Sequence, residues 1–565
     1  MQKTGHASVR CCQNPFRIDL RSLGCFRIAI ATVLLYDVIF QGLDLSALYL
    51  DAGALPAETV SQYHQGTGTW SLHLLWTSPA WQWLLLVARL GAGVALVVGF
   101  RSQLSAAIAW LLTVSMHTRA PMLVSGGDVL LAMMLFWSIL LPIGSRFSVD
   151  SRRKGGGEPG GSVLSLASVG VMLQIVVMYW YTFISKWNPA WFGGDALEII
   201  LSGGMLARPM GTLLLSLPLL LKLLTWGTLL WELVGPLLLL SPWKTRWLRP
   251  IGLAGFVLLH VGIELSINVL IFSFSSLAAL LLFLPASAWS RLDEGRPDVE
   301  PGLQEMTGRG QLRRLPSALA ASCITLVLIY NVIGLTVTGP RPGWATTVRR
   351  MVNMAHWNQQ WNMFDMPEGL VYRFVARGRL AGGRTLDLNR GTPLTAEGIP
   401  ARPDEPIQFS SSRRMLLIRE MVQHENFIFR QQVAEWLVRK WNAEHTGNNQ
   451  VLELEWMVFV GPIDQPAPEP DLLAYVDARA HGGYRYGMRD GHWIMRHDNG
   501  DKAAEGDYRL GREEGNWTFW NERGKRTNMG GFRDGLQHGR WTYYFSDGRE
   551  TEVHYEDGRV IEEAP

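Results

Sequence analysis

Long apolar stretches separated by short polar loops fill the first 340 residues, and polar and apolar positions mix more evenly in the rest of the chain. A helix needs about 20 mostly apolar residues to cross the hydrocarbon core of a bilayer. Such stretches recur, so the sequence predicts a polytopic α-helical membrane bundle of about nine transmembrane helices. We expect these spans near Leu23–Phe40, Trp81–Gly99, Leu104–Met122, Val129–Ile143, Val163–Ile184, Leu213–Leu240, Trp247–Glu264, Asn268–Trp289 and Pro316–Val337.

The basic residues predict how this bundle is oriented, because short cytoplasmic loops of membrane proteins are enriched in Lys and Arg. With the spans placed as above, basic loops alternate with loops that contain few or no Lys and Arg. The basic loops contain Lys3, Arg10, Arg17, Arg21, Arg101, Arg146, Arg152, Arg153, Lys154, Lys244, Arg246, Arg249, Arg291, Arg296, Arg309, Arg313 and Arg314. The other loops contain only Arg119, Lys186 and Arg208, with Lys222 at an edge. The alternation predicts a cytoplasmic N-terminus, an odd number of spans and a tail on the periplasmic or extracellular face.

The pattern of the tail predicts two further regions. Val371–Leu380 and Val451–Val460 alternate as strands do, while Arg413–Trp441 has apolar residues at helical spacing. We therefore expect four parts in the chain. They are a membrane domain at residues 15–290, a cytoplasmic loop with the last transmembrane helix at 291–340, an outer soluble α+β domain at 341–470 and β repeats at 480–560.

The β repeats are predicted from a short motif that recurs every 24 residues. Gly491-His492-Trp493, Gly515-Asn516-Trp517 and Gly539-Arg540-Trp541 are separated by glycine-containing turns and aromatic stretches. Glycine permits tight hairpin turns, and a repeated Trp lets each unit stack on the next. The units resemble MORN repeats, which implies a β-hairpin array. The array is either purely structural or a binding surface for a protein partner.

Composition excludes some classes of function. The net charge of +3 provides no basic field, so we expect no binding of nucleic acid. The four cysteines lie at Cys11, Cys12, Cys25 and Cys323, a placement that argues against a disulfide framework and a cysteine metal site. We expect no metal.

Ionisable residues inside apolar helices are costly, so each requires a partner or a function. The predicted spans contain Arg27, Asp37, Arg89, Lys186, Glu232, His260 and Glu264. We interpret Arg27, Asp37 and Arg89 as structural ion-pair residues.

Lys186 and His260 are the candidate catalytic residues. The spans that carry them run from the cytoplasmic to the outer face, so both side chains are expected toward the outer side, where they could share one pocket. A lysine that is partly removed from water can act as a neutral base. In the alternative interpretation, Lys186 extends to the membrane interface and His260 makes a hydrogen bond in the core.

The order of several motifs resembles the HTTM domain of the vitamin K-dependent gamma-carboxylase superfamily, over roughly residues 15–290. These motifs are Leu23-Gly24-Cys25-Phe26-Arg27, Ser125-Gly126-Gly127-Asp128, the segment from Tyr181 to Gly194, and the segment from His260 to Asn268. The stretch Gln360-Trp361-Asn362-Met363-Phe364 is similar to one that bacterial members carry after the last helix.

The resemblance implies that Lys186 is the base that deprotonates a vitamin K hydroquinone-like quinone. It assigns His260 to the same pocket, and we add Asp128, Trp191, Glu232, Glu264 and Asn268 as candidate ligand-pocket residues. The chain departs from the family in three respects. Ser185 precedes Lys186 where the family enzyme often has a second lysine, and Trp187 replaces an aliphatic residue. The soluble tail with its 24-residue repeats does not resemble the propeptide-binding region of the animal enzyme.

We therefore expect a multi-pass protein of the bacterial inner membrane, with a carboxylase- or epoxidase-like, quinone-dependent site on the non-cytoplasmic side. The alternative is a non-enzymatic membrane anchor that presents the repeats to a protein partner. A transporter is less consistent with the sequence, which lacks a clear internal duplication of broken helices.

Overall fold

The computed structural model describes the chain with gaps. It covers residues 14–65, 67–153, 161–203, 205–289, 314–336, 343–354, 356–357, 359, 361, 363–364, 370–395, 411–423, 426–462, 470–485, 488–497, 499–545 and 549–563. Outside these ranges lie Lys3, Arg10, Cys11, Cys12, Lys154, Arg291, Arg296, Arg309, Arg313, Gln360 and Asn362.

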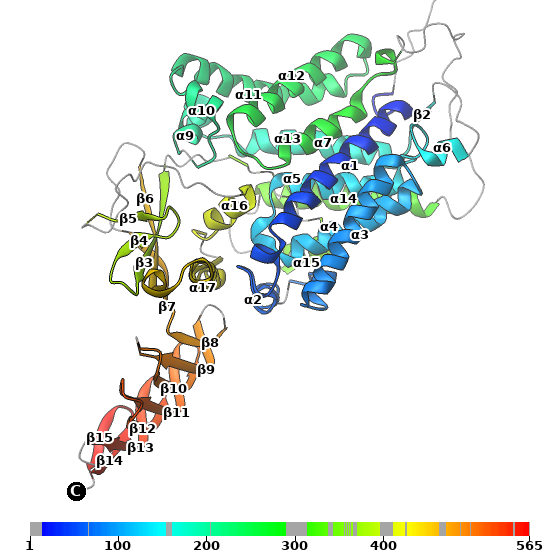
Figure 1. Ribbon diagram of the computed structural model, residues 1–565. Coiled ribbons are helices and arrows are strands. Elements are labelled where there is room, and N and C mark those ends of the chain that lie inside the picture. The colour runs from blue at the N-terminus through cyan, green and yellow to red at the C-terminus, as the bar shows by residue number, and fades with distance from the viewer. Residues whose placement is uncertain are drawn as a thin grey trace, which may run out of the picture. The chain divides into compact units, whose positions relative to one another are not determined.

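Two compact units make up the chain (Figure 1). The helical unit comprises Met1–Leu45 and Gly66–Leu370, and the β-rich unit comprises Ser46–Gln65 and Val371–Pro565. The helical unit extends beyond the expected boundary near residue 340. A short segment between the first two long helices belongs to the β-rich unit instead.

Five helices in the described part of the chain are long and apolar enough to cross a membrane. They are α1 (Leu20–Leu43), α3 (Pro79–Val98), α7 (Leu166–Ser185), α11 (Pro218–Leu239) and α12 (Thr245–Ser266). The nine expected spans are therefore not confirmed. The remaining expected spans contain α4 (Ser102–Arg119), α5 (Gly126–Leu140), α13 (Phe272–Leu280) and α14 (Arg314–Thr336), which are shorter or less uniformly apolar.

Two of the expected spans differ from the structure because proline interrupts or ends the helix. The stretch expected at Leu213–Leu240 is divided between α10 (Pro209–Leu214) and α11, and Pro218 occupies the first turn of α11, where its missing N–H costs nothing. The stretch expected at Asn268–Trp289 forms α13, a 3₁₀ turn at Leu281–Phe283 before Pro285 and a second 3₁₀ turn at Ala286–Ala288 after it. At 1.5 Å per residue, the nine-residue α13 is too short to cross a bilayer.

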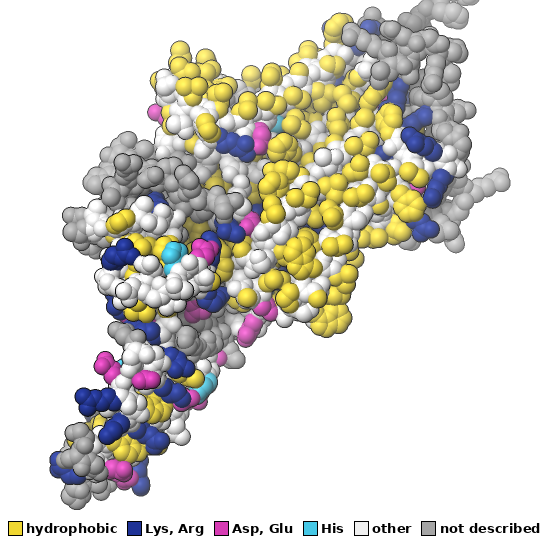
Figure 2. All heavy atoms as spheres, viewed as in Figure 1, with side chains coloured by type: hydrophobic (Ala, Val, Ile, Leu, Met, Phe, Trp, Pro, Cys, Tyr) yellow, Lys and Arg dark blue, Asp and Glu magenta, His cyan; other side chains and the backbone are white. Residues whose placement is uncertain are grey.

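The helical unit is apolar on its outside as well as inside. Helices α1, α3, α4 and α5 pack in sequence, α11 packs on α12, and α7 packs on α14. Large side chains such as Leu219 on α11 and Leu258 on α12 are more than 70% exposed, and Figure 2 shows hydrophobic side chains spread over the visible helical surface. An apolar exterior of this extent is typical of a surface that contacts lipid.

One buried ion pair in this unit is structural, as expected. Arg89 Nη2 donates to Asp37 Oδ2 at 2.8 Å, and both side chains are 1% exposed. Arg89 also donates to Gln41 at 2.6 Å and to Thr113 at 3.1 Å. Arg27 is not part of this ion pair and instead donates to the carbonyl oxygen of Phe147.

Many of the described basic residues of the helical unit gather at one of its ends. Strand β1 (Ile18–Asp19) before α1 pairs with β2 (Ser162–Val163) before α7, and Arg249 near the start of α12 contacts the Pro15 carbonyl. The starts of these three helices therefore share one end, where Figure 2 shows a group of Lys and Arg side chains. We call it the basic end. Because α7 begins there, its last residues lie toward the opposite end.

In the β-rich unit, a five-stranded sheet has the order β5-β4-β3-β6-β7. Its strands are β3 (Leu370–Leu380), β4 (Thr385–Asp387), β5 (Thr392–Pro393), β6 (Val451–Pro462) and β7 (Asp471–Asp477). Helix α17 (Phe427–Glu444) packs on β6 and β7, and α2 (Ala57–Tyr63) packs on α17. Helix α16 (Ser412–Glu420) precedes α17. This arrangement agrees with the expected α+β region.

The C-terminal segment forms an antiparallel sheet of eight strands in which each strand pairs with the next along the chain. The strands are β8 (Ala480–Arg485), β9 (Met488–Arg496), β10 (Lys502–Arg509), β11 (Arg512–Trp520), β12 (Arg526–Arg533), β13 (Leu536–Tyr544), β14 (Glu550–Glu556) and β15 (Arg559–Glu563).

The repeated glycines and tryptophans explain this sheet. The turn Asp534-Gly535 has φ values of 49° and 81°, as expected for a two-residue hairpin turn with positive φ at both central positions. Trp517 and Trp541 are 1–2% exposed, and their indole N–H groups donate to the carbonyl oxygens of Asp507 and Gly531 at 3.1 and 3.0 Å. Each repeat therefore buries its Trp against the preceding strand.

Candidate functional site

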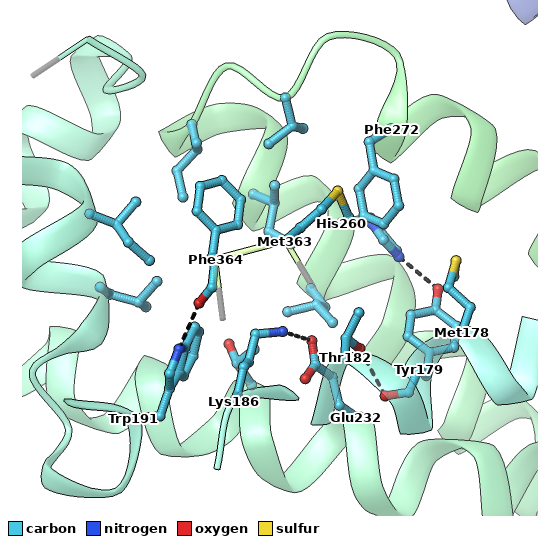
Figure 3. A pocket seen from close by; sticks show the side chains of 17 residues that line it. Met178, Tyr179, Thr182, Lys186, Trp191, Glu232, His260, Phe272, Met363 and Phe364 are labelled. Atoms are coloured by element: carbon cyan, nitrogen blue, oxygen red, sulfur yellow. Dashed lines mark hydrogen bonds and ion pairs between the residues drawn. The ribbon is translucent and has the colours of Figure 1, made fainter. Parts of the chain in front are cut away.

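A cavity of about 60 Å³ lies inside the helical unit near the C-terminal end of α7 (Figure 3). Most of its lining is apolar and comes from α7, α9 (Ala196–Ser202), α11, α12 and the start of α13. The polar residues that line it are Tyr179, Thr182, Lys186, Thr228, Glu232 and His260. An apolar cavity with a few polar groups is typical of a ligand site.

The residues around Lys186 end helix α7 and begin the next short helix. Lys186 is the residue that ends α7, and two residues later Asn188 accepts a hydrogen bond from the Trp191 N–H at 3.3 Å as the N-cap of α8 (Pro189–Gly193). Pro189 takes the first position of α8, and Gly194 ends it with φ of 88°. Asn, Pro and Gly are preferred at these positions. The motif therefore fixes Trp191 beside the lysine.

The Lys186 amine is paired and enclosed. Its Nζ donates to Glu232 Oε1 of α11 at 2.6 Å and lies 5.0 Å from the ring centre of Trp191. The two side chains of the pair are only 5% and 8% exposed. Lys186 therefore does not extend to the membrane interface. Burying two charges is costly unless they pair closely, so Glu232 is the group that permits an ammonium here.

A second polar pair lines the same cavity. The Tyr179 hydroxyl lies 2.7 Å from His260 Nε2, and Tyr179 stacks on Phe256 with ring centres 4.1 Å apart. His260 is 1% exposed, and its Nδ1 atom has no hydrogen-bond partner among the described residues. If Tyr179 donates to Nε2, then Nδ1 carries the imidazole proton and is an unsatisfied donor. The cavity thus combines an amine–carboxylate pair with a phenol–imidazole pair.

The structure brings together four of the seven predicted site residues. Lys186, Trp191, Glu232 and His260 all line the cavity. The other three are not among its lining residues, and each has a local structural role.

Asp128 accepts hydrogen bonds from Ser125, which precedes α5, and so caps that helix. Glu264 pairs with Arg208 at 2.6 Å. The backbone N–H of Asn268 donates to the Leu206 carbonyl at 2.8 Å, within the loop after α12.

Sequence reasoning missed Tyr179 and Thr182. Both lie on α7, seven and four residues before Lys186, and helical spacing places all three on one face. That spacing could have identified them once Lys186 was selected.

Met363 and Phe364 also line the cavity, although they come from a segment that follows α15 (Gly343–Met354). The indole N–H of Trp191 donates to the Phe364 carbonyl at 2.8 Å. The sequence singled out this segment without indicating where it packs.

Comparison with known proteins agrees with the helical architecture. No curated protein matches the chain. Residues 16–289 match the HTTM domain family, and this range includes α1 through α13 and every cavity residue except Met363 and Phe364. Over these residues the helical unit of this chain is therefore similar to the HTTM domain family.

Proposed function

We propose that the chain is a multi-pass protein of the bacterial inner membrane whose cavity binds a quinone or a similar lipid-like ligand, with Lys186 as a base. The observation that carries this proposal is that Lys186 and His260, from different helices, are both enclosed and line one apolar cavity. A lysine that only served solubility or anchoring would extend to water.

The distribution of basic residues supports a cavity near the non-cytoplasmic side. Lys and Arg gather at the end where α1, α7 and α12 begin, and cytoplasmic loops carry this excess. Lys186 lies at the other end of α7, followed by the 70% exposed Trp187. Exposed tryptophans are frequent at membrane interfaces. We therefore propose a cytoplasmic N-terminus and a periplasmic β-rich unit.

The residues present fit a quinone ligand in chemical type. A quinone is a flat, apolar ring with two oxygens, and the cavity offers an apolar lining with polar groups from two separate pairs. The Nδ1 atom of His260 has no hydrogen-bond partner in the part of the chain that the structure describes, and such buried groups require an explanation. A ligand oxygen would provide one.

The chemistry assigned to the chain is one proton transfer. A hydroquinone supplies an acidic hydroxyl and two electrons. The transfer starts from the tautomer of the pair in which Glu232 holds the proton shared across the 2.6 Å hydrogen bond and Lys186 is an amine. The amine of Lys186 then accepts the hydroxyl proton, so that one O–H bond breaks and one N–H bond forms. Trp191 stabilises the resulting ammonium through its ring face.

The test is quinone turnover by the purified protein in lipid nanodiscs. We expect vitamin K hydroquinone and oxygen to give the quinone epoxide, detected by chromatography, and Lys186→Ala to abolish it. Lys222→Ala is the matched control, because Lys222 pairs with Asp195 at 3.3 Å and its side chain is 42% exposed. Absence of epoxide from the unmodified protein, or equal yields from both variants, would contradict the proposed chemistry.

A second candidate function is a membrane anchor that presents the eight-stranded sheet to a protein partner. Exposed apolar side chains on this sheet, such as Leu536 and Phe545 at 49% and 51%, favour it. Deletion of residues 480–565 would then abolish the cellular phenotype, whereas Lys186→Ala would leave it intact. The reverse result supports the site in the membrane.

A further inference from the structure

We propose that Met363 and Phe364 form a displaceable roof over the cavity, which opens to admit the ligand and sets the size of ring that the site accepts. This inference rests on the proposed function, because it concerns access to the same site. It assigns a role to the segment around Trp361–Phe364, which the site chemistry leaves unexplained.

The residues just before the roof are anchored firmly. Trp357 is 2% exposed, and its ring centre lies 4.5 Å from that of Phe136 on α5. Gln359 is 1% exposed and accepts a hydrogen bond from Gln174 on α7 at 2.5 Å. Trp361 is fully buried and donates to Gln359 at 3.3 Å. These three anchor residues hold the segment against the helices that line the cavity.

The roof itself is held more lightly than its anchors. Met363 and Phe364 are each only half-buried and lie in a turn. The Trp191 indole donates to the Phe364 carbonyl (Figure 3), and Phe364 packs against a buried cluster formed by Trp191, Ala196 and Leu229. The Met363 sulfur lies directly against Gly126 at the start of α5, where any added Cβ would overlap it. Glycine at this position thus makes room for the roof.

The cavity is too small for a ring-shaped ligand, so part of its lining must move before such a ligand can bind. Its volume of about 60 Å³ accommodates one or two waters, whereas pockets for ring-shaped ligands begin near 300 Å³. Most of the other lining residues belong to helices packed against one another, where displacement would disrupt the core. Met363 and Phe364 come from a turn and are partly exposed. Moving them is therefore the least disruptive way to enlarge the site.

The roof lies outside residues 16–289, which match the HTTM domain family. The cavity's other lining residues lie inside this range, so the site and its cover come from different parts of the sequence.

A reversible cross-link tests the roof. Gly126→Cys with Met363→Cys places two thiols where a backbone and a side chain now touch, which is compatible with disulfide geometry. The background has Cys11, Cys12, Cys25 and Cys323 replaced by Ser, and each single-cysteine variant is a control. The probe is menadione, with binding measured by equilibrium dialysis in nanodiscs and cross-linking verified by mass spectrometry.

We expect the reduced double variant to bind menadione, oxidation to weaken binding at least tenfold, and dithiothreitol to restore it. Equal binding before and after verified cross-linking would overturn the roof while leaving the proposed function intact. No binding by the cysteine-free parent would overturn the proposed function, and the roof with it.

A size series provides a second, independent readout. Phe364→Ala shortens the roof without a cross-link, so we expect the ratio of anthraquinone to menadione affinity to rise at least tenfold over the parent. Leu328→Ala is the control, since this 42% exposed side chain on α14 is not among the residues that line the cavity. An unchanged ratio in Phe364→Ala would contradict the assignment of ligand size to the roof.

Discussion

Replacing Glu232 with leucine removes the carboxylate that pairs with an enclosed lysine. At 2.6 Å and an effective dielectric constant of about 20, the attraction between the two charges is about 6 kcal/mol. Desolvation offsets much of this, and removal of one partner of a buried pair typically costs about 3–5 kcal/mol. The loss of stability has an upper limit of about 4.6 kcal/mol, which is the cost of deprotonating an ordinary lysine at pH 7. A lysine left without its partner can avoid any larger cost by losing its proton. We expect Glu232→Leu to lower the free energy of unfolding by about 3–4 kcal/mol.

The double variant Lys186→Met/Glu232→Leu is the matched control for this prediction. It removes both charges and keeps a similar apolar volume, so its stability should return to within about 1 kcal/mol of the unmodified protein. The measurement is reversible unfolding in mixed micelles with increasing sodium dodecyl sulfate, analysed as a double-mutant cycle. A loss below about 1 kcal/mol for Glu232→Leu, or strictly additive effects in the cycle, would refute the idea that Glu232 is what permits the buried amine.

The other predictions concern the repeat sheet. Gly530→Ala should destabilise this sheet by about 1–3 kcal/mol, because the added methyl group overlaps the Trp541 ring. A lower thermal midpoint of the full chain, with unchanged helical content, would verify this prediction. His492 donates hydrogen bonds to the carboxylates of Glu505 and Asp507, each at 3.0 Å, and these bonds raise the pKa of His492. The stabilisation from His492 is therefore complete below its unfolded pKa, near 6.5, and disappears as pH rises through the folded value. Thermal midpoints of the His492→Asn variant should lack this pH dependence, and an identical pH profile in both proteins would contradict it.

Hydropathy located the helices correctly but not their lengths. All nine expected stretches contain a helix in the structure, because an apolar helix is stable both in a protein interior and in contact with lipid. Only five are long and apolar enough to span a membrane among the described residues. Pro285 lies just beyond the shortest of them, α13, since a missing N–H ends a helix whatever the hydropathy of its neighbours. Pro218 only divides the stretch at Leu213–Leu240 between α10 and the long helix α11.

The site could be predicted only in part, and the physical reason differs between residues. Lys186, Glu232 and His260 were identifiable because a charged or polar group in an apolar helix needs a partner. Glu264 met the same criterion, but its ion pair with Arg208, the residue before α10, accounts for it. Met363 contacts Gly126 across more than two hundred residues of sequence, and no local pattern encodes such a contact.

Two buried ion pairs in the same unit distinguish a structural role from a functional one. Around Arg89 and Asp37, Gln41 and Thr113 complete a closed hydrogen-bond network, so the pair stabilises the packing of α1, α3 and α4. The Lys186–Glu232 pair instead lines a cavity that His260 also lines, and the Nδ1 atom of His260 has no hydrogen-bond partner among the described residues. An apolar pair would stabilise that position as well as an ionic pair does. Stability therefore does not account for this lysine, whereas the proposed transfer of a proton from a ligand to Lys186 would.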